Sequence, residues 1–198
     1  MQMLISKNKL EKLYSRGLSM QEIADRKKWP YHSVRYWMER HNVDRRPHDE
    51  AAYIRANPTG DPFHIKEILT VDEQKLYGLG LGIFWGEGNK SSKNAVRLGN
   101  SDPNLIKIFR EFLLKICGVK REKIKYSLLL FNDANQNNAI GFWARELDID
   151  TKQIGSVTTL APRGKGTYKK KSMTGVLIIE CNNTKLKKWI DQAIANIK

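Results

Sequence analysis

The chain has 198 residues, of which 40% are hydrophobic, enough for one domain of ordinary size and a small additional module. Its net charge of +14 is uneven, with +6 over residues 1–46, zero over 47–150 and +8 over 151–198, which indicates contact with a polyanion at two places. The sequence has no C-x-x-C pair, which argues against the common zinc and redox motifs. It has no apolar run near 20 residues, which argues against a membrane partner. It shows no secretory signal, which predicts a cytoplasmic location.

Residues 1–46 carry the pattern of three short helices. The first is expected over 6–16, where apolar residues recur at helical spacing, and Gly17 is expected to end it in a left-handed conformation. Ser19 and Glu22 have the spacing of a capping box, which predicts the start of a second helix. Pro30 ends that helix, and a third is predicted over 31–41.

The run Gly17-Leu-Ser-x-x-Glu-Ile-Ala, followed by Val34 and Trp37, resembles helix-turn-helix modules of bacteria and phages. The resemblance implies that the third helix enters the major groove of double-stranded DNA. Arg35 is suited to guanine, and the arm after the helix to the phosphate backbone or the minor groove. The side chains predicted to contact DNA are Tyr31, His32, Ser33, Arg35, Tyr36, Arg45 and Arg46. The alternative is a three-helix protein-interaction bundle.

A glycine-rich helix is predicted over residues 78–88. Gly78, Gly82 and Gly86 form a bare stripe on one face, at a cost of about 3 kcal/mol in helix propensity. Close contact with another helix would explain this cost. Apolar side chains fill the other faces, so the helix is expected to be buried nearly all round, with Glu87 at its C-terminal end in need of a cation. The alternative is a buried structural helix with an incidental terminal glutamate.

The run Gly80-Leu-Gly-Ile-Phe-Trp-Gly-Glu-Gly88 is similar to the signature of the LAGLIDADG homing endonucleases, although Trp85 replaces the first acid and Gly80 the first leucine. The resemblance implies that two such helices pack glycine to glycine at a twofold axis. It also implies that Glu87 is the catalytic acid and binds a divalent metal, Mg²⁺, shared at that axis. One motif per chain implies a homodimer whose interface contains Gly78, Gly82 and Gly86.

The rest of the chain shows alternating strand and helix patterns. Strands are expected at 95–99, 124–131, 151–160 and 173–180, and helices at 102–118, 135–147 and 185–197. This order is near that of a single LAGLIDADG domain. The predicted class is therefore α+β, with a helix-turn-helix module over 1–46, a Pro- and Gly-containing linker over 47–73, and a LAGLIDADG-like mixed α/β domain with an antiparallel sheet over 74–198.

Basic residues of this second part form a further set of predicted DNA contacts. In the LAGLIDADG family the sheet lies in the major groove, which makes positions on strands and in adjoining turns candidates: Lys90, Lys93, Arg97 and Lys125. The densest basic stretch is a Gly/Lys-rich loop whose lysines can neutralise phosphates: Arg163, Lys165, Lys169, Lys170 and Lys171. The alternative for that loop is a solvated hairpin tip.

These patterns predict a sequence-specific DNA-binding protein that acts as a dimeric, Mg²⁺-dependent, double-strand endonuclease of the homing type. A LAGLIDADG-like transcriptional regulator that binds without cleaving is the first alternative. A helper of intron RNA splicing is the second.

Overall fold

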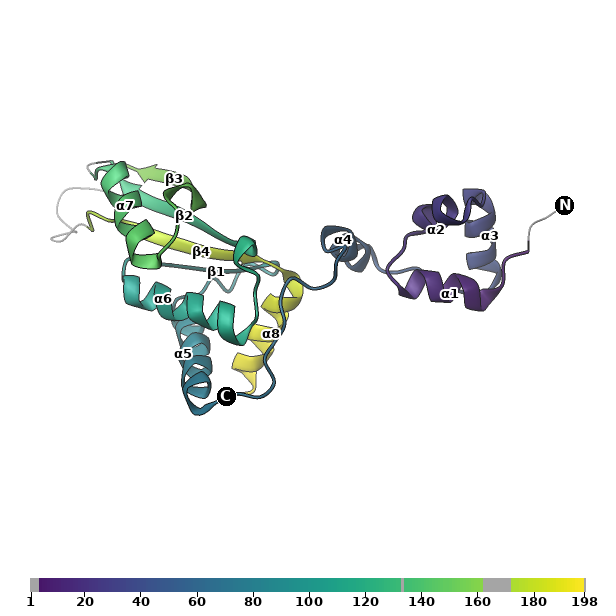
Figure 1. Cartoon of the computed structure of the whole chain (residues 1–198), viewed down its shortest axis with the longest axis horizontal. Coiled ribbons are helices and arrows are strands. Elements are labelled where there is room, and N and C mark those ends of the chain that lie inside the picture. The colour runs from purple at the N-terminus through teal and green to yellow at the C-terminus, as the bar shows by residue number, and fades with distance from the viewer. Residues whose placement is uncertain (1–3, 133, 162–171, 198) are drawn as a thin grey trace. The chain divides into compact units, whose positions relative to one another are not determined.

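The computed structural model describes residues 4–132, 134–161 and 172–197, and it is of mixed α+β class (Figure 1). The chain divides into two compact units, 1–61 and 62–198. The boundary falls inside the segment 47–73 that was expected to be a linker. Each unit has a hydrophobic core of its own.

The N-terminal unit begins with three helices, α1 (Lys7–Ser15), α2 (Met20–Lys27) and α3 (Tyr31–Arg40). Ser19 and Glu22 make both bonds of the expected capping box. Lys28 adopts the left-handed conformation at the turn into α3, with φ of 54°. The core consists of Ile5, which lies before α1, and of side chains from all three helices: Leu10, Leu13, Ile23, Ala24, Val34 and Met38.

A fourth helix, α4 (His48–Ala56), occupies part of the expected linker. Asp49 and Glu50 lie in its first turn, where negative charge is favourable to the helix dipole. A β-carbon built on Gly17 would lie 3.2 Å from Ile54 Cγ2, so α4 contacts the turn between α1 and α2. None of the side chains of α4 is fully buried, so the segment lacks the regular apolar stripe by which a helix is predicted from sequence.

Residues 62–73 of the expected linker are part of the second unit. Its backbone bonds to the segment around Gly118: His64 N donates to Cys117 O at 3.0 Å and Lys66 N to Ile116 O at 2.9 Å. Gly118 has a φ of 58°, and a β-carbon there would lie 2.3 Å from His64 O. Only glycine fits this close approach without rearrangement of the backbone.

The second unit contains four strands, β1 (Ala95–Asn100), β2 (Ile124–Phe131), β3 (Ile154–Leu160) and β4 (Val176–Asn182), in the order β1-β4-β2-β3. β4 pairs antiparallel with β1 and β2, whereas β2 and β3 are parallel. The prediction of an antiparallel sheet is therefore wrong for β3. The connection from β2 to β3 contains the helix α7 (Gln136–Leu147), the kind of crossover that parallel neighbours require.

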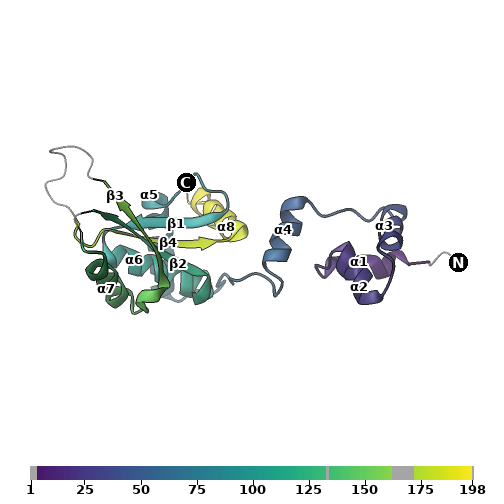
Figure 2. The same cartoon turned by 90° about the horizontal axis from the view of Figure 1, so that it is seen from above.

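Helices cover one face of this sheet (Figures 1 and 2). They are α5 (Val71–Glu87), α6 (Pro103–Glu111), α7 and α8 (Thr184–Ala195), with short 3-10 helices at Arg121–Lys123 and Thr151–Gln153. Burial alternates along β2: Tyr126 and Leu128 belong to the core, while Lys125 and Ser127 are on the uncovered face. Among the described residues, no helix covers the other face of the sheet.

The helix predicted over 102–118 is α6 followed by a π-helix, Phe112–Ile116. Asp102 and Pro103 begin α6 as N-cap and first helical residue, as the sequence predicts. The wider turn follows, and Cys117 N donates to Phe112 O at 3.0 Å. This segment packs against α5.

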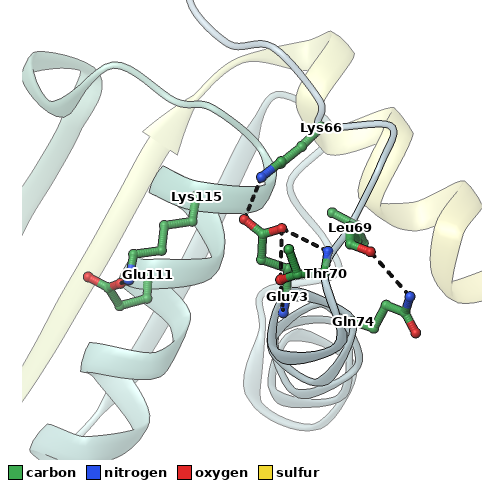
Figure 3. Close-up of polar contacts among 7 residues, drawn as sticks. All are labelled: Lys66, Leu69, Thr70, Glu73, Gln74, Glu111 and Lys115. Carbon is green, nitrogen blue, oxygen red and sulfur yellow. Dashed lines mark hydrogen bonds and ion pairs between the residues drawn. The ribbon is translucent and has the colours of Figure 1, made fainter.

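The first turn of α5 is held by a polar cluster (Figure 3). Thr70 and Glu73 form a capping box, and Lys66 Nζ donates to Glu73 Oε1 at 2.6 Å. The hydrogen bond from Lys66, with those from Thr70, lowers the pKa of Glu73 below its usual value. Lys66 thereby ties the segment before α5 to the start of the glycine-rich helix. Figure 3 also shows the Glu111–Lys115 ion pair.

Candidate nucleic-acid interface

The outward face of α3 carries the side chains that were predicted to read DNA. Tyr31 and Tyr36 are 41% and 45% exposed, and His32 and Arg35 are exposed as well. Ser33 is less exposed, being half-buried, and Val34 belongs to the core. The face therefore combines two aromatic rings, an imidazole and a guanidinium that are accessible to a ligand.

The carboxylate of Glu39 binds two of the arginine side chains that were predicted to contact DNA. Its Oε1 accepts a hydrogen bond from Arg35 Nε at 3.2 Å and another from Arg45 Nη2. All three side chains are about half exposed, and ion pairs of this kind contribute only about 0–1 kcal/mol. Both arginines can consequently leave Glu39 for a stronger acceptor at little cost. The spacing of Arg35 and Glu39, four residues apart on a helix, already indicates this ion pair in the sequence.

Arg46 does not extend into solvent as an arm. Its guanidinium donates to the carbonyls of Tyr14, Gly17 and Leu18, and lies 4.0 Å from the Tyr14 ring centroid. These carbonyls belong to the C-terminal end of α1 and the turn that follows it, where backbone acceptors lack helical partners. Arg46 was predicted to contact DNA from the arm after the third helix, and in this structure its donors stabilise the unit itself.

The uncovered face of the sheet brings Arg97 and Lys125 into one row. Both are paired in register with Glu180, which lies on β4 between their strands. Arg97 Nε is 3.5 Å from Glu180 Oε2. A hollow of about 480 Å³ opens beside this row, where Gly155 makes a bulge in the pairing of β2 and β3. The role of Glu180 is not readable from the sequence because it depends on the pairing of distant strands.

Two of the other basic residues predicted to contact DNA are described by the structure, and five are not. Lys90 and Lys93 are exposed between α5 and β1, and Lys90 Nζ donates to Gly86 O at 3.1 Å. A cation therefore lies at the C-terminal end of α5, where the helix dipole favours it. The remaining predicted contacts lie outside the described residues: Arg163, Lys165, Lys169, Lys170 and Lys171.

The glycine-rich helix is not buried nearly all round, and that prediction is wrong. Only Gly80, Leu81 and Phe84 of α5 are buried, while Leu79 and Trp85 are 52% and 51% exposed. The helix packs on the unit through one face. The opposite face carries the glycine stripe (Gly78, Gly82 and Gly86), and a β-carbon built on any of the three meets no described atom within 4 Å.

Glu87 is the last residue of α5, and it is exposed rather than buried. Among the described residues it has no hydrogen bond or ion pair, and no group of three or more histidine, cysteine or acidic side chains could hold a metal ion. Mg²⁺ in proteins commonly takes one or two carboxylates together with water and substrate phosphates. Glu87 alone could therefore supply one of the ligands of such an ion, with water and phosphates as the others.

Comparisons of the chain with family models, with curated proteins and with solved structures found no match. Within the described part of the chain, no helix combines the length and apolar character needed to cross a membrane.

Proposed function

We propose that this chain binds double-stranded DNA as a homodimer and cleaves both strands with Mg²⁺. The observation that carries the proposal is the glycine stripe of α5, which ends beside the exposed carboxylate of Glu87. Three glycines in a helix cost about 3 kcal/mol relative to alanine. No contact within the described chain accounts for that cost, so the proposal assigns it to an approaching second backbone.

A second copy would also cover the apolar side chains next to the stripe. Leu79 and Trp85 are half exposed on α5, and burial of large apolar surface is the main favourable term in association. Aromatic residues such as tryptophan are enriched at protein interfaces. Two α5 helices in contact through their glycines would bring two Glu87 carboxylates to one end of the helix pair.

The DNA partner is supported by two surfaces of different units. One is the exposed face of α3, whose Tyr36 and Arg35 can reach base edges and phosphates. The other is the uncovered face of the sheet, where Arg97 and Lys125 lie in one row. Their acidic neighbours, Glu39 and Glu180, are weak competitors with the closely spaced phosphates of a duplex.

Glu87 of each copy would hold the metal against the scissile phosphates. A divalent ion bound there supplies an activated water and stabilises the leaving oxygen. Lys90, whose ammonium group lies at the end of α5, adds positive charge close to the place that the phosphates would occupy.

The test compares wild-type protein with Glu87→Gln on a library of DNA duplexes with Mg²⁺ or Mn²⁺. Gln keeps the size of the side chain and removes its charge, so dimerisation and DNA affinity should persist while cleavage disappears. Glu67→Gln, at another exposed carboxylate, is the matched control and should cut like wild type. Equal cutting by wild type and Glu87→Gln would remove Glu87 from the mechanism.

A second candidate is a DNA-binding regulator that does not cleave. The observation in its favour is that, among the described residues, no group of three or more histidine, cysteine or acidic side chains could hold a metal ion. DNA binding by wild type without cutting under any metal would identify the regulator. A marked preference for intron RNA over duplex DNA would identify a splicing helper.

A further inference from the structure

A hollow of about 400 Å³ lies in the N-terminal unit between the α1–α2 turn and α4. Its apolar wall includes Ile54, which contacts Gly17 across the turn. Polar and charged groups form the rest of the lining, and the full set is Arg16, Gly17, Leu18, Ser19, Glu22, Arg46, Ala51, Ile54, Arg55 and Pro58.

Three arginines from three different segments meet at this hollow with one acid. Arg16 follows α1, Arg46 follows α3, and Arg55 belongs to α4. The carboxylate of Glu22 accepts a hydrogen bond from Ser19 N at 2.7 Å and caps α2. The hollow therefore has two positive charges in excess, and the first turn of α2 is already capped by its own side chains.

The donors of these arginines are unequally used. Arg46 donates to three carbonyls, so it contributes mainly charge. Arg16 and Arg55 are exposed, and neither guanidinium has a hydrogen bond or an ion pair with another described residue. Two guanidinium groups with free donors thus face one hollow beside a fixed positive charge.

We propose that this hollow is a phosphate-binding site in which Arg16 and Arg55 hold one phosphodiester group of the DNA backbone. Guanidinium groups match phosphate oxygens in a bidentate manner, and the fixed charge of Arg46 strengthens the attraction. The DNA source rests on the proposed function. Phosphate contacts carry no sequence information, but they set the register of a reading element, here α3.

The first test measures duplex binding by the full chain at several salt concentrations, for wild type and Arg16→Ala/Arg55→Ala. The double variant should bind every sequence more weakly by a similar factor, and the slope of log affinity against log salt should fall by about one. Arg26→Ala, an exposed arginine of α2 outside the hollow, is the control for loss of positive charge. If the loss of duplex affinity per arginine removed is no larger in the double variant than in Arg26→Ala, the proposed site is overturned.

The second test uses pyrophosphate and does not depend on DNA binding. Amide chemical shifts of Gly17, Leu18 and Ser19 should move on titration in wild type and stay in place in the double variant. Absent shifts, or shifts that persist in the double variant, would overturn the phosphate site. Pyrophosphate binding without any duplex binding would leave the site intact and overturn the proposed function. Duplex binding that is the same in wild type and in the double variant would overturn the phosphate site and leave the proposed function intact.

Discussion

Gly80 of α5 lies against the side chain of Phe112, so closely that a β-carbon built on Gly80 would be 2.1 Å from Phe112 Cγ. Both residues are buried. The contact joins α5 to the π-helix that follows α6. Two kinds of glycine therefore occur in one helix: Gly80, whose small size the unit itself requires, and the glycine stripe, which faces outward.

We expect Gly80→Ala to destabilise the second unit by about 1–3 kcal/mol, because overpacking forces displacement of side chains or backbone. Gly82→Ala is the matched control: its β-carbon meets no described atom, and alanine favours the helix by about 1 kcal/mol. Urea unfolding of both variants, at concentrations low enough to dissociate a dimer, measures the difference. Equal stability of the two would show that Phe112 can move aside freely.

The proposed dimer predicts a different result for a bulkier substitution on the outward face. Gly82→Leu should leave the fold of the single chain intact, because the position is open, and should prevent two α5 helices from meeting. Sedimentation velocity should then show a dimer for wild type and a monomer for the variant, with circular dichroism as the check on folding. A dimer that survives Gly82→Leu would place the interface elsewhere.

Arg46→Ala should destabilise the N-terminal unit by about 1.5–3 kcal/mol, the range for hydrogen bonds to charged groups. The substitution leaves three carbonyls around the α1–α2 turn without the guanidinium and removes its contact with Tyr14. Hydrogen exchange of core amides in α1 and α3 of the full chain measures the effect. Arg45→Ala, which removes an exposed ion pair, should change exchange little; equal acceleration by both variants would contradict the structural role of Arg46.

Both cysteine thiols should resist labelling in the native protein. Burial raises the pKa of Cys117, and it raises the pKa of Cys181 to about 11, so little of the reactive thiolate forms at pH 8. Their raised pKa values leave stability unaffected well below pH 8.5 and reduce it as pH rises above the pKa of an unfolded thiol, about 8.5. An aromatic disulfide reagent should react only on unfolding, and rapid labelling of folded protein would contradict the burial.

Local patterns were sufficient to predict several elements from the sequence alone. The capping box of Ser19 and Glu22 and the Asp102-Pro103 start of α6 depend on contacts within one turn of helix, so their spacing reveals them. The strand predicted over 124–131 is confirmed as β2, whose buried and exposed residues alternate. The excess of basic residues at the two ends of the chain is likewise a property of the sequence.

Only the tertiary structure decided which segments far apart in the sequence come into contact. The parallel pairing of β2 with β3, the docking of Arg46 on α1 and the contact of Gly80 with Phe112 all join segments that are distant in sequence. Glycines two positions apart are alike in the sequence, yet they point to different sides of a helix with 3.6 residues per turn. The packing of α5 through one face made Gly80 a core residue and left Gly78 and Gly82 open to solvent.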